Sequence, residues 1–497
     1  MSRRTLAPPL FLLAAAFLCY GGPAITRLGF YHDDWILLSY MRFAPAGFVP
    51  AMDGLLLNIP SLWFRPLGLP LYSLLYLLFG LNPISWQACL LLTNALAAFA
   101  ILRILLRFAV PERTALLGSL LFLCWPSKDA TMFWPFVIIN SASLLAMLAA
   151  YLAHLDFVET GRRRSLALSA AAVAVSLTLY DQCVFLFPLW LVTPSLLEKG
   201  VSARAKLGAA TAATATAAYL LFKLVFVPYV LLVPFNKTFT LTAHHFLMTY
   251  LRGVEANLGP RLILFCLRSL HAAFAAAPFV AATAAAFAWL APGRSSEDRP
   301  RPEAPVALVL LGAGVFLLGY LPIAVSDYWP TPIDHTNRIN QVPAAGLVLA
   351  LIGAGALVLE PRRLERAAVL LASVLLAVHV GLAGIWAESY RRQIEVRELI
   401  LANLSRWPAD KLLLVMLPER YVNGKAPVFD APYDISGAAR IWTGDEARRA
   451  DTVTPRMVFA PGGISGASGL IPYGSTLLLD VRRGLLKIPE HRDFQGN

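Results

Sequence analysis

Long apolar stretches separated by short polar connections make up most of the chain. A membrane-spanning helix needs roughly 20 apolar residues, or fewer where interfacial residues anchor its ends, so the pattern predicts about eleven transmembrane helices. The expected spans run near residues 6–26, 84–107, 114–126, 136–157, 165–181, 183–198, 206–228, 260–290, 305–325, 341–359 and 367–387. The third is short, and the fifth and sixth follow each other closely enough to form a tight hairpin. The predicted fold is an all-α polytopic membrane protein.

The pattern changes after Trp386, where polar sequence with turn residues replaces the long apolar stretches. Short apolar runs remain, such as Leu412–Leu417 and Thr476–Leu479. Runs of this length between turn residues are typical of strands. We therefore expect a transmembrane domain over residues 1–388 and a small soluble α/β domain over residues 389–497, whose role the sequence does not indicate.

The distribution of charge predicts the orientation in the membrane. The chain has 58% hydrophobic and 14% charged residues, with a formal net charge of +12. Because the positive charge lies in short clusters between apolar spans, it indicates cytoplasmic loops, and no nucleic-acid partner is expected. With the N-terminus in the cytoplasm, the inside connections contain Arg103, Arg107 and Arg113; Arg162, Arg163 and Arg164; Lys199, Arg204 and Lys206; Arg294, Arg299 and Arg301; and Arg362, Arg363 and Arg366.

The opposite connections carry acidic and aromatic residues instead, at Asp33-Asp34, Lys128-Asp129, Tyr180-Asp181 and residues 327–338. One orientation satisfies both patterns, so residues 389–497 are expected outside the cytoplasm. Frequent Ala, Leu and Arg residues suggest a bacterium with a GC-rich genome. We therefore expect a multi-pass protein of the bacterial inner (plasma) membrane with a periplasmic C-terminal domain.

Two of the outer connections are long, at about residues 27–83 and 229–259. The first contains an apolar stretch from Leu69 to Phe79 that is too short to span the bilayer comfortably. It is expected to form an interfacial helix that lies against the lipid bilayer.

The acidic pair Asp33-Asp34 follows the first span directly, in the sequence Gly29-Phe30-Tyr31-His32-Asp33-Asp34-Trp35. Two adjacent carboxylates at the end of a membrane helix are costly to desolvate and repel each other. They could cap the following helix, although one aspartate would suffice for that role. The pair is the strongest candidate for a catalytic base or a metal ligand at the outer membrane surface.

Further ionisable residues lie at the outer ends of spans, and each has a structural alternative. Asp129 could be a solvated loop charge or a partner of Lys128, and Asp181 could be a hydrated hairpin tip. Arg65 could extend toward lipid headgroups or clamp a phosphate. Arg338 could anchor the membrane interface or bind a phosphate with two hydrogen bonds.

Other conspicuous features suggest no chemistry. The glycine-rich stretch Gly462–Gly466 matches neither a dinucleotide-binding fingerprint nor a nucleophile elbow, so a plain loop is expected. The histidines His244, His245 and His335 lack the spacing of a metal-ligand set. The cysteines lie in apolar stretches without paired spacing and are expected to be small buried hydrophobic residues: Cys19, Cys89, Cys124, Cys183 and Cys266.

Taken together, carboxylates and arginines on one face at the lipid boundary suit a reaction on a lipid-linked phosphate. The arginines would neutralise the leaving phosphate, and a carboxylate would take the proton from an incoming hydroxyl group. The membrane spans would hold the lipid tail.

In this arrangement the chain resembles the GT-C-type membrane glycosyltransferases, the fold shared by protein O-mannosyltransferases and lipid A aminoarabinose transferases. The resemblance covers roughly residues 1–390. It rests on these features in order: Asp33-Asp34 after the first span; Arg65-Pro66-Leu67, Phe79-Gly80, Pro83 and Asn94; Pro126 to Trp134; Asp181 and Pro188; and Arg338 with Pro343-Ala344-Ala345-Gly346.

The resemblance implies a transmembrane catalytic domain, a polyprenyl-phosphate-linked sugar as donor, an extracytoplasmic acceptor and an inverting transfer. Asp33 or Asp34 would be the general base, with Asp34 slightly favoured because it adjoins Trp35, an expected membrane anchor. Arg65, Lys128, Asp129, Asp181 and Arg338 would bind the donor phosphate or substrate. Many relatives have a glutamate where Asp181 stands. No metal or cofactor is expected, because separated Asp-x-Asp ligands are missing, although a divalent cation is not excluded.

Two other classes of function compete with glycosyl transfer. O-antigen polymerases and ligases act on pyrophosphate-linked glycans, but they tend to use arginine-rich outer loops rather than an acidic pair after the first span. Lipid or glycan transporters show internal repeats and broken helices at the membrane midplane. No repeat is visible here, and most charges lie at the ends of spans. The sugar, carrier lipid and acceptor are open.

Overall fold

The computed structural model describes residues 3–192, 202–234, 239–272, 303–333, 335–455, 457–466 and 469–494. The C-terminal part of the expected span 183–198, most of the expected span 260–290, and the basic residues Lys199, Arg294, Arg299 and Arg301 lie outside the described residues.

The chain divides into two compact units. The first, here called the membrane unit, comprises Met1–Thr26, Pro60–Leu71 and Ser85–Gly384. The second, here called the C-terminal unit, comprises Arg27–Ile59, Tyr72–Ile84 and Ile385–Asn497. The C-terminal unit therefore includes Asp33-Asp34 and most of the first outer connection. The domain boundary expected near residue 388 stays a prediction.

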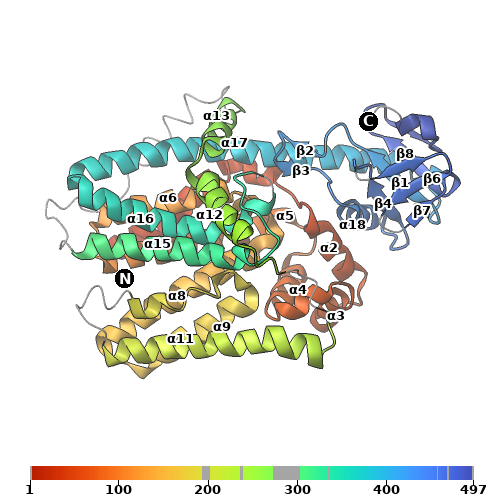
Figure 1. Cartoon of the computed structure of the whole chain (residues 1–497). Helices are drawn as coiled ribbons and strands as arrows, with labels where there is room; N and C mark the ends of the chain where they lie inside the picture. Colours follow the sequence, from red (N-terminus) through yellow and green to blue (C-terminus); the bar gives the residue numbers. More distant parts are fainter. Residues whose placement is uncertain are drawn as a thin grey trace. The chain divides into compact units, whose positions relative to one another are not determined.

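The membrane unit is helical throughout its described residues (Figure 1). Its α-helices are α1 (Arg3–Cys19), the start of α4 (Gly68–Phe79), α5 (Pro83–Arg107), α6 (Glu112–Leu123), α7 (Ala130–Phe133), α8 (Ile138–Thr160), α9 (Arg163–Leu179), α11 (Ala203–Leu221), α12 (Ala243–Leu258), α13 (Pro260–Ala272), α15 (Glu303–Ala324), α16 (Gln341–Val358) and the first part of α17 (Pro361–Ala402). Short 3₁₀ or π segments join them, including η2 (Pro60–Phe64), η3 (Pro126–Lys128), η4 (Pro135–Val137), η5 (Asp181–Cys183), η6 (Phe222–Val230) and η7 (His335–Asn340).

Six helices in the described part of the chain are long and apolar enough to cross a membrane. They are Pro83–Arg107, Pro135–Thr160, Ala203–Val230, Ala304–Ala324, His335–Val358 and Pro361–Ala402. The chain is an integral membrane protein on this ground. The predicted number of about eleven spans is not confirmed. Helix α6 has 12 residues, which gives a length of about 18 Å, less than the roughly 30 Å hydrocarbon core.

Glycines allow α15 and α16 to pack closely, and the two helices run side by side in Figure 1. A Cβ atom added to Gly346 would lie 2.5 Å from the Gly312 carbonyl oxygen and 2.5 Å from the Phe316 nitrogen. A Cβ atom on Gly353 would meet the backbone of Pro305 at 2.9 Å. Small residues at helix contacts are the usual means of tight packing in membranes, where no hydrophobic force drives helices together.

Buried amides fix the turns between the membrane helices. Asn94 on α5 donates to the Thr131 carbonyl oxygen at 2.9 Å, and Gln341 on α16 donates to the Ser141 hydroxyl at 2.9 Å. Backbone groups freed by irregular turns need such partners where water is excluded. The turn that contains Asp129 is therefore held by neighbouring helices.

The connections predicted to lie outside the cytoplasm are more helical than expected. Residues 243–258, predicted to be part of a long loop, form α12, whose first turn is capped by the Thr242 side chain. The predicted interfacial helix Leu69–Phe79 exists as α4 (Gly68–Phe79). Its position relative to a membrane stays a prediction.

The C-terminal unit combines helices with three small sheets. Its helices are α2 (Asp33–Phe43), α3 (Phe48–Asn58), most of α4, the last part of α17, and α18 (Pro432–Thr443). Its strands are β1 (Leu412–Met416), β2 (Tyr421–Val422), β3 (Ala426–Pro427), β4 (Arg449–Thr452), β5 (Val458–Ala460), β6 (Gly463–Gly466), β7 (Gly469–Ile471), β8 (Thr476–Asp480) and β9 (Leu485–Lys487). The predicted α/β character is confirmed.

The main sheet has the order β4-β1-β8-β9. Strand β1 is parallel to both β4 and β8, and β9 is antiparallel to β8. The two apolar runs seen in the sequence are thus the two central strands, buried because both faces are covered. The expected plain loop at Gly462–Gly466 is wrong, because Gly463–Gly466 is strand β6 and pairs with β5 and β7.

Helix α17 has 42 residues, so it is about 63 Å long, roughly twice the thickness of the hydrocarbon core. The helix therefore continues beyond the apolar stretch that ends near Trp386, through Arg391, Arg392 and Glu395. The sequence change after Trp386 marks a change of surroundings along one helix and not the end of that helix.

Candidate active site

The two aspartates of the acidic pair have different surroundings at the start of α2. The Asp34 side chain is buried, and its Oδ2 accepts a hydrogen bond from the Tyr31 backbone N–H at 2.7 Å. The Asp33 side chain is 28% exposed, and its Oδ1 lies 2.7 Å from Nδ1 of His32. Asp34 therefore stabilises the turn before the helix, whereas Asp33 remains accessible to a substrate.

His32 lies between two carboxylates. Its Nδ1 contacts Asp33, and its Nε2 lies 3.2 Å from Oδ1 of Asp430. Burial lowers the pKa of His32, but the charges of Asp33, Asp430 and Asp434 outweigh burial and raise the pKa to about 9. The imidazole ring is therefore protonated at neutral pH, so both of its nitrogens carry a proton.

His32 also has a backbone conformation that side chains rarely adopt, with φ 47° and ψ −123°. Such a conformation costs on the order of 1–3 kcal/mol and persists where the surroundings hold it, commonly at functional sites. Here the surroundings are the two carboxylate contacts of the ring. In this backbone conformation the imidazolium lies beside Asp33.

Helix α18 contributes the remaining groups of this cluster. The Tyr433 hydroxyl lies 3.4 Å from Nε2 of His32, and the charge of Asp33 acts on it. Burial and the nearby carboxylates raise the pKa of Tyr433 well above its usual range, so the hydroxyl stays a proton donor. Asp434 accepts the backbone N–H groups of Asp430 and Ile435 at 3.1 and 2.7 Å and so caps the helix start. We call His32, Asp33, Asp430, Tyr433 and Asp434 the acidic cluster.

Trp35 does not have the role expected of it. The residue is only 4% exposed, and its Nε1–H donates to Oε1 of Gln393 at 2.8 Å. Its ring packs edge-on against Trp442 of α18, with centroids 5.3 Å apart. The prediction that Trp35 anchors the membrane interface is wrong, and the reason for preferring Asp34 as the base disappears with it.

In the membrane unit, Asp129 and Arg338 are brought close through Asn337. Asp129 is fully buried and accepts a hydrogen bond from the Asn337 side-chain amide. Arg338, the next residue, donates to the His335 carbonyl oxygen at 3.0 Å, and its guanidinium carbon lies 5.2 Å from the centre of the Trp134 ring. The Arg338 side chain is thus held by an aromatic face while part of it stays exposed.

Lys128 is buried and lies apart from solvent. Its ammonium donates to the Leu123 carbonyl oxygen at 3.3 Å and lies 4.6 Å from the centre of the Phe122 ring. Burial lowers the pKa of Lys128 to about 8. Lys128 is therefore a weaker candidate for a phosphate contact than Arg338, since its charge is directed into the protein.

Arg65 and Asp181 are brought together in the same way, through Tyr180. The guanidinium carbon of Arg65 lies 4.5 Å from the centre of the Tyr180 ring. Asp181 forms an ion pair with Lys223, whose side chain is 13% exposed. A backbone hydrogen bond of 3.2 Å from Leu67 to Thr178 fixes the two segments next to each other.

These two pairs are linked to each other. The side-chain amide of Gln182, next to Asp181, donates to the carbonyl oxygen of Ile339, next to Arg338. Since consecutive Cα atoms are about 3.8 Å apart, Asp181 and Arg338 flank a single hydrogen bond. These contacts place four of the predicted residues in neighbouring segments, together with the unpredicted Lys223: Arg65, Asp181, Lys223, Arg338 and Asp129. We call this set the cationic belt.

Sequence reasoning missed Lys223, Asp430 and Tyr433. Lys223 could have been found, because it is a charged residue near the end of an otherwise apolar span, and such residues are rare and usually functional. It also lies in the π-helical segment η6, a form common at functional sites. Nothing in the sequence links Asp430 and Tyr433 to His32, because about 400 residues separate them along the chain.

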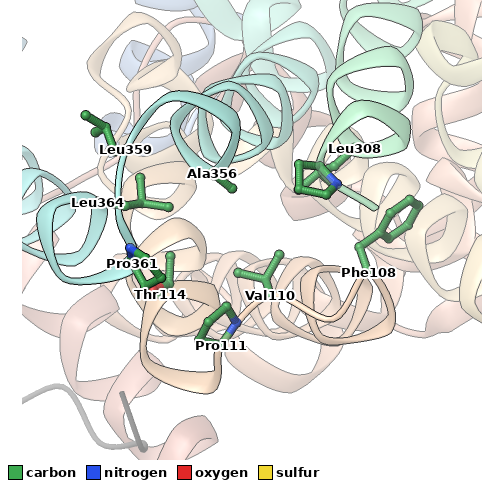
Figure 2. Close-up of a pocket in the computed structure, with 10 residues that line it drawn as sticks. Phe108, Val110, Pro111, Thr114, Leu308, Ala356, Leu359, Pro361 and Leu364 are labelled. Carbon is green, nitrogen blue, oxygen red and sulfur yellow. The ribbon is translucent and has the colours of Figure 1, made fainter. Parts of the chain in front are cut away.

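An apolar pocket of the membrane unit contains none of the candidate residues (Figure 2). Its volume is about 20 Å³, enough for one water molecule. It is lined by Phe108, Val110, Pro111, Thr114, Pro305, Leu308, Ala356, Leu359, Pro361 and Leu364. The pocket is too small and too apolar for a sugar or a phosphate.

No family model matches this chain, and no curated protein matches it. Among solved structures, the chain is similar to ArnT from Cupriavidus metallidurans bound to undecaprenyl phosphate, with a TM-score of 0.43, 15% identity and 89% of each chain covered. It is also similar to ArnT from the same organism in the apo state, with a TM-score of 0.41, 16% identity, and 90% of this chain and 85% of that chain covered.

Proposed function

We propose that the protein is a membrane glycosyltransferase that moves a sugar from a polyprenyl-phosphate carrier to an extracytoplasmic acceptor, with inversion at the anomeric carbon. The observation that carries the proposal is the partly exposed carboxylate of Asp33 in a membrane protein, with its Oδ1 2.7 Å from Nδ1 of the His32 imidazolium. A carboxylate that is accessible and oriented by a neighbouring imidazolium is suited to general base catalysis.

Asp33 acts as the base in this proposal. The acceptor hydroxyl gives its proton to the Asp33 carboxylate as its oxygen forms a bond to the anomeric carbon. The bond between that carbon and the phosphate oxygen breaks, and its electron pair leaves with the polyprenyl phosphate. The His32 imidazolium favours the ionised form of its neighbour and keeps the carboxylate oriented. Asp34 is a positioning residue, because it stabilises the turn that carries Asp33.

The cationic belt binds the donor phosphate. Arg338 and Arg65 each lie over an aromatic ring, which fixes a guanidinium group while leaving some of its donors available. Guanidinium groups bind phosphate oxygens with paired hydrogen bonds, and Lys223 adds a compact charge. Asp129 positions Arg338 through Asn337, and Asp181 positions Lys223.

The reaction needs no resident metal ion in this proposal. A metal would have to neutralise the acidic cluster, but the His32 imidazolium already supplies positive charge between Asp33 and Asp430. The leaving group is a phosphate monoester, whose charge Arg65, Arg338 and Lys223 of the cationic belt would offset in part. Transfer is therefore expected to be unchanged by EDTA.

The test is sugar transfer in membranes that contain the wild-type protein or single variants, supplied with radiolabelled polyprenyl-phosphate sugars. Loss of a general base typically slows a reaction by roughly 10²–10⁴-fold, so Asp33→Asn should lower the rate by this amount. Asp34→Asn should have a smaller effect, mainly through stability. Asp53→Asn is the matched control, because Asp53 is an exposed aspartate on α3 of the same unit.

The same assay tests the cationic belt. Arg338→Gln and Lys223→Gln should raise the KM for the donor by about tenfold or more, since each removes a charged hydrogen-bond donor. Arg261→Gln removes an exposed ion-paired arginine of the membrane unit. It should leave the KM for the donor unchanged. Full transfer by Asp33→Asn would overturn the assignment of the base, and absence of transfer with every donor would overturn the proposed class.

A further inference from the structure

The C-terminal unit contains a second pocket whose place in the main sheet suggests a binding site. The pocket has a volume of about 310 Å³, within the range of small-molecule sites. It is lined by Arg391, Arg392, Glu395, Val396, Leu417, Pro418, Glu419, Val428 and Val481. We call it the switch-point pocket, for the reason that follows.

The pocket lies at the carboxyl ends of two adjacent parallel strands. Leu417, Pro418 and Glu419 follow β1 directly, and Val481 follows β8. From β1 the chain passes through α18 to β4 on one side, and β8 then adds on the other side of β1. The strand order therefore reverses between β1 and β8, and open parallel sheets bind ligands outside the carboxyl ends of strands at such a point.

The walls of this pocket are firmly held. The Val481 backbone N–H donates to the Met416 carbonyl oxygen at 3.1 Å, and Arg482 donates to the Pro418 carbonyl oxygen at 3.0 Å. Arg392 forms an ion pair with Glu419, which joins α17 to the end of β1. A site with fixed walls loses little conformational entropy on binding.

The charged groups define the chemistry of the ligand. Two arginines and two glutamates line the pocket, so their formal charges cancel. Arg391 and Glu395 are about half exposed, at 58% and 49%. An anion would meet the glutamates and a cation would meet the arginines. Guanidinium groups only donate hydrogen bonds and carboxylates only accept them, whereas a hydroxyl group does both.

We infer that the switch-point pocket binds a neutral saccharide through Arg391, Arg392, Glu395 and Glu419. The apolar side chains of Val396, Leu417, Val428 and Val481 provide a surface for the C–H face of a sugar ring. The binding step stands independently of the proposed reaction.

The bound saccharide is the glycan acceptor, an identification that rests on the proposed function. Val428 lines the pocket, and Asp430 of the acidic cluster follows two residues later. Two residues span at most about 7 Å, so the pocket wall and the acidic cluster belong to the same short segment. A saccharide in the pocket would therefore contact a segment that also contributes to the acidic cluster.

The test uses the full-length protein, purified in a detergent without a sugar headgroup, and saturation-transfer NMR. The probes are methyl α-mannoside, methyl β-galactoside, methyl N-acetyl-β-glucosaminide and cellobiose, with inorganic phosphate as the anionic probe followed by ³¹P line broadening. At least one saccharide should bind to the wild-type protein, and phosphate should not compete with it. Val481→Trp, which fills the pocket, should abolish binding, and Glu395→Gln should weaken it about fivefold or more.

The matched control is Arg483→Gln, which removes an arginine of the same unit that is 75% exposed, ion-paired and outside the pocket. It should bind saccharide as the wild type does. Thermal unfolding shows whether Val481→Trp is folded, and the exposed Glu395→Gln variant keeps the test valid if it is not. In the transfer assay, Val481→Trp should raise the KM for the acceptor without changing the KM for the donor.

No binding of any saccharide, binding that survives Val481→Trp and Glu395→Gln, or competition by phosphate would overturn the inference, whatever the transfer assay gives. Saccharide binding that depends on the pocket in a protein without transferase activity would support the site and contradict the proposed function. Transfer by a protein whose pocket binds no sugar would support the proposed function and contradict the saccharide site.

Discussion

At the residue scale, His32 carries the clearest pH dependence. Its folded-state pKa of about 9 lies above the ordinary value of 6.5, because two carboxylates flank the ring. A raised pKa contributes stability that is fully present below pH 6.5 and is lost as the pH rises through 9. The difference corresponds to about 3 kcal/mol for this nearly buried group.

We predict that the free energy of unfolding falls between pH 6.5 and 9 and that His32→Asn flattens this part of the profile. Asparagine tolerates positive φ better than most residues, so the variant keeps the backbone turn at lower cost. The measurement is chemical unfolding followed by Trp fluorescence across this pH range. The control is His244→Asn, because His244 is exposed. His154→Asn is not suitable, since His154 is buried in a membrane helix. A wild-type profile that is flat from pH 6.5 to 9 would contradict the ion pairing.

At the element scale, the sequence predicted single strands and helices better than the contacts between them. The apolar runs at Leu412–Leu417 and Thr476–Leu479 were readable as strands because strand length and turn residues are local properties. Asp33-Asp34 stood out because two carboxylates after a span are costly. The contact of His32 with Asp430 could not be predicted from the sequence, because it depends on how α18 packs against α2. The same holds for Gln182 and Ile339, whose hydrogen bond joins two distant turns.

The packing of α18 against α2 depends on Gly437. A Cβ atom on Gly437 would lie 2.5 Å from the carbonyl carbon of Trp35 and 2.6 Å from Cα of Ile36. Both atoms belong to the backbone and cannot move aside as a flexible side chain would. The glycine is therefore required by close approach, although glycine is the poorer helix former by about 1 kcal/mol.

We predict that Gly437→Ala destabilises the C-terminal unit by about 1–3 kcal/mol, because overpacking outweighs the gain in helix propensity. It should also lower transfer, since Tyr433 and Asp434 on the same helix would shift relative to His32. Ser436→Ala is the matched control at the neighbouring position of α18, and it should be neutral or slightly stabilising. Thermal unfolding of both variants decides the matter, and an increase in Tm for Gly437→Ala would contradict the close packing.

At the scale of the whole molecule, charge distribution predicts which segments face the cytoplasm. The basic connections at Arg162–Arg164 and Arg362–Arg366 are expected inside, and residues after helix α17 are expected outside. Both the acidic cluster and the switch-point pocket belong to the C-terminal unit, so the proposed reaction requires that this unit be extracytoplasmic. Orientation is therefore a condition for the whole proposal.

We predict that a cysteine at position 410 is labelled by a membrane-impermeant maleimide in intact cells, whereas a cysteine at position 163 is labelled only after permeabilisation. Asp410→Cys and Arg163→Cys both replace exposed side chains, so burial does not limit either reaction. The background protein has its five cysteines replaced by alanine, which suits their apolar surroundings. Labelling of position 163 from outside, with position 410 protected, would invert the topology. That result would place Asp33 on the cytoplasmic side and contradict an extracytoplasmic acceptor, because a general base must lie on the same side of the membrane as the hydroxyl group that it deprotonates.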